Sequence, residues 1–352
     1  MPRLLIAASG TGGHIYPALV FATSLPQSWE IQWLGVPNRL EIELVPKKYN
    51  LTILKVGGLQ GNIFRKIFEL FKLIFASFQV SILLRQKKID VIFTTGGYIS
   101  APSILGAKLT GIPIVLHESN SIPGKVSRLF GRFCDHVALG IPSASEYLPG
   151  CKTSFTGTPV RSDFFLEQSL PSWVPSGEGV LIVIMGGSQG AKKMNEMVRN
   201  VLPWLLDKGC RVVHLTGNND CFYRNPGRIK THPNLVVRHF SNEMAALLQN
   251  ADLAISRAGA GAISELMVTK TPSILIPFPP SADHHQEFNA GYMARFGGAI
   301  IVNQHNPEEH ILRSILSNLL SSNSLKKMKS NMSNYDVLNS ENKIFEIMNT
   351  II

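Results

Sequence analysis

Four glycine-rich turns could hold the phosphates of an anionic ligand. Each follows a short apolar run, and together they are Gly10–Gly13, Gly96-Gly97, Gly186–Gly190 and Gly259–Gly261. A glycine turn between a strand and a helix lets the backbone approach a phosphate closely. The helix N-terminus adds unpaired N–H groups and about half a positive charge. Tight turning alone would explain any one of these glycine groups, but four in the same context favour phosphate binding.

The first and third turns differ from the common nucleotide signatures. Neither is followed by the Lys-Ser/Thr pair of a P-loop, and neither has GxGxxG spacing. The second apolar run, residues 31–34, ends in Gly35 where a dinucleotide fold would have an acid for the ribose. We therefore expect neither NAD nor any other cofactor.

His14, at the end of the first glycine turn, is the candidate general base. An unperturbed imidazole has a pKa of about 6.5, which suits proton abstraction near neutrality. His14 could instead support the turn or bind a phosphate. Glu118 is an alternative base, or a partner that orients the loop containing Asn120.

No set of residues with metal-ligand spacing stands out. Asp283-His284-His285-Gln286 contains two histidines, but adjacent side chains point apart and no third ligand is evident. No DxD motif or comparable carboxylate cluster is present. The cysteines lie singly in the chain, without the spacing of a disulfide framework or zinc knuckle, and favour a reducing cytosol. They are Cys134, Cys151, Cys210 and Cys221. We predict that the chemistry needs no bound metal.

The elements that must position these residues occur twice along the chain. Apolar run, glycine turn and helical segment begin near residue 4 and again near residue 180. A second repeated pattern begins at Asp90 in the first half of the chain and at Asp252 in the second half. Continuous β-branched runs that alternate with helical segments predict parallel strands buried on both faces. We therefore predict two doubly wound α/β domains, with a linker near residues 157–163 and ligands beyond the carboxyl ends of the strands, in a cleft between the domains.

Composition and charge point to an anionic partner. The 352 residues are 45% hydrophobic and 16% charged, which is typical of packed globular domains, and the net charge is +10. No RRM, KH, zinc-finger or helix-turn-helix signature supports nucleic acid as that partner. The apolar stretch at 73–84 is interrupted by polar residues and falls short of the roughly 20 residues that a membrane crossing needs.

Residues 63–88 combine basic and aromatic side chains. Six basic residues stand against the single acid Glu69, and five phenylalanines recur at steps of four, three, four and three. The phenylalanines therefore share one helical face. Such a stripe is usually packed in a core. Together with the positive charge, it would also suit an anionic membrane surface. The residues are Arg65, Lys66, Lys72, Arg85, Lys87 and Lys88, and Phe64, Phe68, Phe71, Phe75 and Phe78.

An ordered set of short motifs resembles the MurG family of bacterial glycosyltransferases. Each motif is weak alone, but the set covers residues from about 4 to 290. The motifs are Gly10-Thr-Gly-Gly-His14, Gly96-Gly97-Tyr98, His117-Glu-Ser-Asn120, Gly157-Thr-Pro-Val-Arg161, Gly186-Gly-Ser-Gln-Gly-Ala191, Ser256-Arg-Ala-Gly-Ala-Gly261 and Asp283-His-His-Gln286.

The resemblance implies a GT-B fold and a defined reaction. N-acetylglucosamine (GlcNAc) would pass from UDP-GlcNAc to the C4 hydroxyl of the muramyl sugar of lipid I, with inversion at the anomeric carbon, to give lipid II for the cell wall. Residues 1–160 would form the acceptor and membrane-facing domain and 161–335 the UDP-GlcNAc-binding domain. Residues 336–352 would be a helix that crosses back. The resemblance also implies peripheral attachment to the cytoplasmic face of the plasma membrane.

The resemblance further implies roles for individual residues. Thr11, Gly12 and Gly13 would lie at the donor, and Asn120 and Gln286 would reach the GlcNAc hydroxyls, since amides both donate and accept. Arg161 and Ser188 would face the diphosphate, and Glu265 would accept from the ribose hydroxyls. The Ser241 backbone would lie near the uracil. The remaining nucleotide-lining residues would be Gly259, Ala260, Gly261, Ala262, Ile263 and Ser264.

The sequence is also compatible with other functions. The main alternative is another enzyme on the same fold, such as a UDP-GlcNAc 2-epimerase or a transferase with a soluble acceptor. Neither would need the basic aromatic segment. A nucleic-acid-binding module would explain the charge but has no motif to support it.

Overall fold

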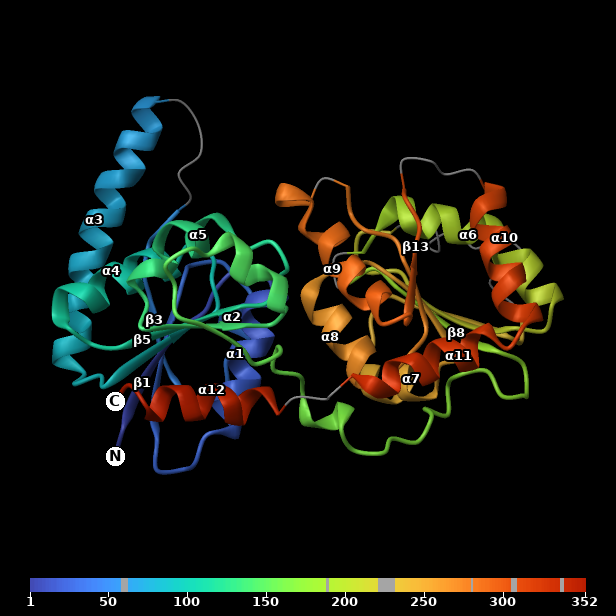
Figure 1. Cartoon of the computed structure of the whole chain (residues 1–352), viewed down its shortest axis with the longest axis horizontal. Helices are drawn as coiled ribbons and strands as arrows, with labels where there is room; N and C mark the ends of the chain where they lie inside the picture. Colours follow the sequence, from blue (N-terminus) through green and yellow to red (C-terminus); the bar gives the residue numbers. More distant parts are fainter. Residues whose placement is uncertain (58–62, 188–189, 221–231, 280, 305–308, 336–338) are drawn as a thin grey trace. The chain divides into compact units, whose positions relative to one another are not determined.

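The chain folds into two compact α/β units (Figure 1). The computed structural model describes residues 1–57, 63–187, 190–220, 232–279, 281–304, 309–335 and 339–352. One unit comprises Met1–Val160 with Leu338–Ile352, and the other comprises Arg161–Val337.

The first unit is built on a seven-stranded parallel sheet. Its strand order is β3-β2-β1-β4-β5-β6-β7, so the chain reverses its direction of travel across the sheet between β1 and β4. The strands are β1 (Arg3–Ala7), β2 (Glu30–Gly35), β3 (Asn50–Ile53), β4 (Val91–Thr94), β5 (Ile114–Glu118), β6 (His136–Leu139) and β7 (Thr153–Phe155).

Helices cover both faces of this sheet. Alternate residues of the central strand β1 are accordingly buried in two different cores. Leu4 and Ile6 belong to the cluster that contains residues of α1 and α12. Leu5 and Ala7 belong to the cluster that contains residues of α3 and α4. The continuous apolar runs of the sequence are thus explained by burial on two sides. The helices are α1 (Gly12–Ser24), α2 (Glu41–Leu44), α3 (Ile63–Gln86), α4 (Ser100–Thr110), α5 (Lys125–Phe130) and α12 (Ser340–Asn349), with 3₁₀ turns at Gly131–Phe133 and Pro142–Tyr147.

The C-terminal helix α12 packs into the first unit. Ile344 and Met348 are fully buried in the same core as Ile15 and Phe21 of α1. Phe345 meets Trp29 edge to face, with ring centroids 5.7 Å apart. The final residues of the chain therefore complete the core that the first strand begins.

The second unit is built on a six-stranded parallel sheet with the order β10-β9-β8-β11-β12-β13. Its strands are β8 (Leu181–Met185), β9 (Arg211–Leu215), β10 (Leu235–Arg238), β11 (Leu253–Ser256), β12 (Ser273–Leu275) and β13 (Ala299–Ile301). Its helices are α6 (Lys192–Asp207), α7 (Met244–Asn250), α8 (Ala260–Val268), α9 (His285–Arg295), α10 (Glu309–Ser321) and α11 (Ser324–Asn331), with 3₁₀ turns at Ser162–Phe164, Ala282–His284 and Met332–Asn334.

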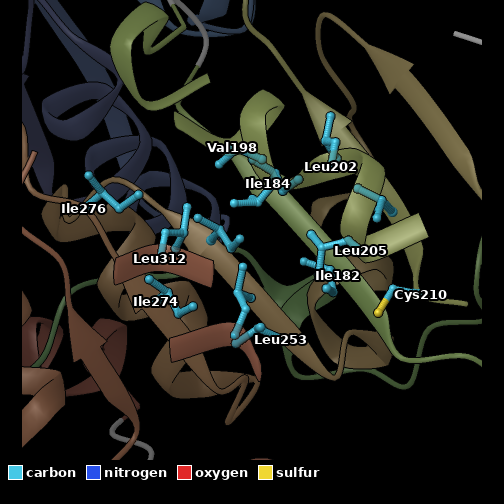
Figure 2. Close-up of a cluster of buried hydrophobic side chains, with 14 of the residues drawn as sticks. Ile182, Ile184, Val198, Leu202, Leu205, Cys210, Leu253, Ile274, Ile276 and Leu312 are labelled. Carbon is cyan, nitrogen blue, oxygen red and sulfur yellow. The ribbon is translucent and has the colours of Figure 1, made fainter. Parts of the chain in front are cut away.

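A large apolar cluster lies on one face of this second sheet (Figure 2). Ile182 and Ile184 of β8 pack with Leu202 and Leu205 of α6 and with Leu312 of α10. All five side chains are buried. The alternate residues of β8 are buried too, so this sheet is also covered on both faces.

The sequence pattern that occurs in both halves of the chain corresponds to the same arrangement of strands in both units. In each unit the first strand pairs with the strand that follows the reversal, β1 with β4 and β8 with β11. Asp90 accepts a hydrogen bond from the Arg3 amide at 2.7 Å, where β1 begins. Asp252 accepts one from the Leu181 amide at 2.8 Å, where β8 begins. The prediction of two doubly wound parallel-sheet domains is confirmed.

Candidate active site

The predicted glycine turns lie where each sheet reverses its strand order. In the first unit, residues 10–13 follow β1 and Gly96-Gly97 follow the adjacent strand β4. In the second unit, residues 186–190 follow β8 and 259–261 follow the adjacent strand β11. Ligands of open α/β sheets bind beyond the carboxyl ends of the strands at such reversal points. Each unit therefore has a candidate ligand site at this edge.

His14 is held by the β4–α4 turn in an orientation that suits a base. Its Nδ1 lies 2.6 Å from the carbonyl oxygen of Thr95, and the Thr95 hydroxyl donates to the His14 carbonyl at 2.8 Å. Because a carbonyl can only accept, Nδ1 carries a proton, and Nε2 of the neutral imidazole is left as an acceptor. In this tautomer Nε2 is the ring nitrogen that is able to take up a proton.

Gly96 and Gly97 make room for this imidazole. Both have left-handed backbone conformations, with φ of +90° and +80°. A Cβ on Gly96 would lie 3.3 Å from His14 Cε1, and one on Gly97 would lie 3.7 Å from His14 Cδ2. A side chain at either position would be strained, and one at Gly96 would also crowd the ring.

The turn Thr11–Gly13 begins helix α1 with open amide groups. Thr11 is the N-cap residue, but its side chain accepts no hydrogen bond from the helix, and the first turn contains no acid. The first amides of a helix have no partner within it. They leave a partial positive charge at this edge of the sheet that suits an anion.

Glu118 is an orienting group, since both of its oxygens are occupied. Oε1 accepts from the amide and the side-chain nitrogen of Asn120, at 3.0 and 3.1 Å. Oε2 accepts from the Gly124 amide at 3.0 Å and from the Ser127 hydroxyl at 2.7 Å. A buried carboxylate engaged in this way has no open position for a substrate proton. Of the two roles left open for Glu118, the structure favours positioning of the Asn120 loop.

In the second unit, the turn after β8 rests directly on the end of β9. Gly187 and Gly190 have φ of +83° and +84°. A Cβ on Gly190 would lie 2.5 Å from the Thr216 carbonyl oxygen, so only glycine fits there. Ser188, the predicted diphosphate contact, lies outside the described residues.

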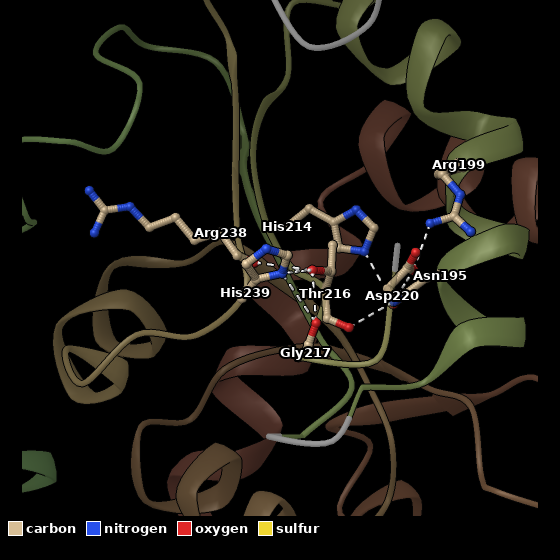
Figure 3. A network of polar contacts seen from close by, with 8 residues as sticks. All are labelled: Asn195, Arg199, His214, Thr216, Gly217, Asp220, Arg238 and His239. Atoms are coloured by element: carbon tan, nitrogen blue, oxygen red, sulfur yellow. Dashed lines mark hydrogen bonds and ion pairs between the residues drawn. The ribbon is translucent and has the colours of Figure 1, made fainter. Parts of the chain in front are cut away.

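A buried polar network beneath this turn was not predicted (Figure 3). Asn195 donates to the Thr216 carbonyl at 2.9 Å and to Asp220 at 2.7 Å, and its oxygen accepts from His214 Nε2 at 3.2 Å. Arg199 forms a buried ion pair with Asp220 at 2.8 Å. Burial lowers the pKa of His214 to about 4, so this imidazole is neutral. The only signal in the sequence is that Asn195 and Arg199 interrupt the buried face of α6 at helical spacing.

Glu265 carries a carboxyl group whose pKa is raised in this fold. It lies on α8 and is partly buried, and the residues that the structure describes make no hydrogen bond or ion pair to its carboxyl group. Burial raises its pKa to about 7, and the positive charge of Arg161 opposes that rise. Donor hydroxyls would stabilise the ionised form.

Some residues at the start of helix α8 are buried and others are partly exposed. Gly259 is the N-cap, without side-chain capping and without an acid in the first turn. The side chains of Ala260 and Ile263 are buried in the core, so a ligand would meet these two positions at the backbone. Gly261, Ala262 and Ser264 are partly exposed.

Gln286 and Ser241 are both fixed by local contacts. The Gln286 oxygen accepts from the Phe278 amide at 2.9 Å, which turns its NH₂ group to the other side. Asp283 and His284, just before it, have φ of 51° and 55°. This strained pair of residues sets the start of α9. The Ser241 hydroxyl accepts from the Glu243 amide at 3.1 Å.

Helix α3 carries an exposed apolar face, which we call the α3 face. It consists of Phe68, Phe71, Ile74, Phe75, Phe78 and Ile82, with Phe71 and Phe75 each 65% exposed. The opposite side of the helix packs on α4 through Ala76, Val80 and Leu84. The close approach depends on Gly106 of α4, where a Cβ would lie 2.8 Å from Val80 Cγ1. The described part of the phenylalanine stripe is therefore a surface and not a core. The side chains of Phe64, Arg65 and Lys66 lie outside the description.

Within the described ranges, no group of three or more His, Cys, Asp or Glu side chains could hold a metal ion. No helix there has both the length and the apolar character that a bilayer crossing requires.

Comparison with known proteins gives the same two halves. Residues 4–139 match the glycosyltransferase family 28 N-terminal domain, and residues 181–345 match the corresponding C-terminal domain. The chain is 78% identical over 351 residues, covering 100% of both chains, to a Prochlorococcus marinus (strain NATL1A) protein. That relative is named UDP-N-acetylglucosamine–N-acetylmuramyl-(pentapeptide) pyrophosphoryl-undecaprenol N-acetylglucosamine transferase. The chain belongs to the MurG family of glycosyltransferases.

Further members support this membership. A Synechococcus sp. (strain WH7803) protein of the same name is 58% identical, over 91% of this chain and 88% of its own. The crystal structure of Acinetobacter baumannii MurG aligns with a TM-score of 0.82 and 26% identity, covering 99% of this chain and 100% of the other. The predicted MurG resemblance and its GT-B fold class are confirmed.

Proposed function

We propose that this chain transfers GlcNAc from UDP-GlcNAc to the C4 hydroxyl of the muramyl sugar of undecaprenyl-pyrophosphoryl-MurNAc-pentapeptide, known as lipid I. The product is lipid II, the disaccharide precursor of peptidoglycan. The observation that carries the proposal is the full-length match to relatives named for this reaction. The glycine turns at both strand-order reversals support it, because both substrates contain a diphosphate.

The first unit would supply the base. His14 Nε2 takes the proton from the attacking hydroxyl, because the Thr95 carbonyl keeps the other ring nitrogen protonated. The hydroxyl oxygen bonds to the anomeric carbon as the bond from that carbon to UDP breaks, so the configuration inverts. The electron pair of the broken bond leaves on the diphosphate. The open amides of α1 suit an anionic group close to the reacting sugar.

The second unit, residues 161–335, would bind the donor. Arg161, Ser188 and the start of α6 would stabilise the departing diphosphate, since a guanidinium holds phosphate through several donors. Glu265 would accept from both ribose hydroxyls. The Gln286 oxygen is already engaged, so its NH₂ group would donate to a GlcNAc hydroxyl. Asn120 would contribute from the first unit, with its amide oriented by Glu118.

The nucleotide base would lie near the Ser241 backbone. The start of α8 would line the nucleotide through Gly259, Ala260, Gly261, Ala262, Ile263 and Ser264, and Thr11, Gly12 and Gly13 would complete the donor site. None of these roles requires a metal ion or a cofactor, and we propose that the reaction uses neither.

Product analysis with UDP-GlcNAc and a short-chain lipid I analogue tests the reaction. We expect a β-1,4-linked disaccharide and one UDP for each product. His14→Ala should lower kcat by about 10²–10⁴-fold and leave donor binding little changed. Release of UDP or epimerisation of the sugar without disaccharide would favour an epimerase or a hydrolase on the same fold. Full turnover by His14→Ala would dismiss this residue as the base.

We propose that the first unit, residues 1–160, docks on the anionic inner leaflet of the plasma membrane through the α3 face. Exposed phenylalanines insert favourably at a lipid interface, and each nearby Lys or Arg adds about 1 kcal/mol of attraction to anionic lipid. The acceptor is tethered to a polyprenyl chain, so such docking would place the first unit near it.

Sedimentation with vesicles tests this attachment. Phe71→Ser with Phe75→Ser should weaken binding to anionic vesicles, while Leu166→Ser, at an exposed apolar position of the other unit, should not. Reversing the charges of Lys72, Arg85, Lys87 and Lys88 should also weaken it. Equal binding to neutral and anionic vesicles, or no effect of either set, would contradict the proposal.

A further inference from the structure

Glu41 is a buried carboxylate at the ends of the two strands that lead to the first glycine turn. The residue has no exposed surface and is the first of the short helix α2. Its Oε1 accepts from the Ser9 hydroxyl at 2.5 Å and from the Val36 amide at 2.7 Å. Its Oε2 accepts from the Gly10 amide at 3.3 Å. One side chain thus joins the residues that follow β1 to the residue that follows β2.

The surrounding chain is shaped to hold this carboxylate. A Cβ on Gly35 would lie 2.8 Å from Glu41 Cγ, so the glycine at the end of β2 leaves space for the side chain. Ser9 is also buried. A carboxylate has only acceptor positions, and here they receive two backbone amides and one hydroxyl. Burial of such a group is costly unless hydrogen bonds of this kind compensate it.

The contact sets the path of the turn that carries the candidate base. Gly10 has φ of +107°, and its amide points at Glu41. Only three residues, Thr11–Gly13, separate this anchor from His14, which the Thr95 carbonyl holds at the other end. The turn is therefore held on both sides, by Glu41 at Gly10 and by the Thr95 carbonyl at His14.

We propose that Glu41 is a positioning residue for the transfer reaction. It holds the β1–α1 turn so that the His14 imidazole and the first amides of α1 keep the arrangement that the acceptor hydroxyl needs. The inference rests on the proposed role of this turn in glycosyl transfer. It assigns no contact between Glu41 and either substrate.

Two variants test the hydrogen bonds of Glu41 separately. Glu41→Gln keeps the size of the side chain and one acceptor oxygen, but it places an NH₂ group against an amide donor. Ser9→Ala removes only the hydroxyl contact. Asp90→Asn is the matched control, because Asp90 also accepts from a backbone amide of β1, at the opposite end of the strand.

The measurements are kcat and KM for UDP-GlcNAc and for a short-chain lipid I analogue, with UDP affinity from calorimetry and Tm from thermal unfolding. We expect Glu41→Gln to lower kcat/KM for the acceptor by about 10–10²-fold, the scale of an ångström displacement of a reacting group. The dissociation constant of UDP should stay within about twofold of the wild-type value, because the residues proposed to contact the nucleotide and its diphosphate lie on the other unit. Ser9→Ala should act in the same direction with a smaller effect, and Asp90→Asn should leave both substrates' kinetics unchanged.

Other outcomes overturn the proposal. A merely structural Glu41 would lower Tm and the fraction of protein that binds UDP, with kcat per UDP-binding molecule unchanged. If Glu41→Gln does not fold, Ser9→Ala with wild-type acceptor kinetics refutes the inference on its own. Failure of the wild-type protein to form disaccharide would instead overturn the proposed function.

Discussion

If Glu265 binds the ribose as proposed, its raised pKa predicts that donor binding depends on pH near neutrality. Its value of about 7 reflects burial of the carboxyl group, with only partial compensation by the charge of Arg161. Two ribose hydroxyls can donate to the ionised form, while the protonated form loses acceptor positions. UDP-GlcNAc should therefore bind the carboxylate and favour loss of the proton. Affinity is highest above pH 7 and falls as the pH falls through 7.

The size of the effect follows from that pKa. If only the ionised form binds, the apparent dissociation constant is the intrinsic one multiplied by one plus the ratio of protonated to ionised carboxyl. That factor is about 1.1 at pH 8 and about 11 at pH 6. Affinity for UDP-GlcNAc should thus fall about tenfold between pH 8 and pH 6.

Calorimetry with UDP-GlcNAc at pH 6, 7 and 8 measures this slope. The intact diphosphate diester has no group of its own that titrates in this range. Glu265→Gln should weaken binding at pH 8 by about 10–10²-fold, the cost of lost hydrogen bonds to a charged group, and should remove most of the slope. Glu196→Gln, an exposed glutamate of α6, should leave the slope intact.

Thermal unfolding of the ligand-free protein gives an independent check of the sign. A carboxyl whose pKa is higher in the folded than in the unfolded state destabilises the fold as the pH rises from about 4.5 through 7. Glu265→Gln should therefore not lower Tm at pH 8, even though it removes a binding group. A wild-type affinity that changes less than twofold between pH 6 and 8, or an equal slope in Glu265→Gln, would refute the reasoning.

Three further substitutions test the turn, the core and the buried network. Gly96→Ala introduces a side chain at φ +90° beside His14, so it should cost about 1–2 kcal/mol and lower kcat at least tenfold without changing UDP affinity. Leu202→Ala should lower the free energy of unfolding of the second unit by about 2–5 kcal/mol in urea titrations, because the side chain is fully buried. Asp220→Asn removes the buried charge that faces Arg199 and should cost about 3–5 kcal/mol by the same measurement. A loss below about 1 kcal/mol in either of the last two would contradict the packing or the ion pair described here.

The fold could be predicted because its signals are local. Strands that are buried on both faces need apolar residues at every position, which explains continuous runs such as 4–8 and 181–185. A glycine turn follows each of these runs directly, before the next helix starts. The stripe in α3 could not be assigned in the same way, since helical spacing is identical for a core face and a docking face. The deciding contact, between Val80 and Gly106, joins two helices and leaves no periodic signal.

The glycine turns of the candidate site could be located from the sequence because their backbone conformation is a local property. Gly96 and Gly190 have positive φ, which favours glycine. In contrast, the orientation of His14 depends on a carbonyl 81 residues away. The role of Glu118 depends on how many hydrogen-bond donors contact its carboxylate in the folded chain. Such contacts are set by tertiary structure, so the sequence left two readings of Glu118 open.

The four helices that start beside the strand-order reversals share a feature that would suit an anionic ligand. Helices α1, α4, α6 and α8 have neither a capping side chain nor an acid in the first turn. A capping side chain typically stabilises a helix by about 0.5–2 kcal/mol, and Thr11 is of a type that often caps yet does not do so here. The open amides keep their partial positive charge for an external anion. The repeated fold therefore gives both units the same kind of uncapped helix start beside the reversal, while the roles proposed for His14 on one unit and Glu265 on the other would fit them for different substrates.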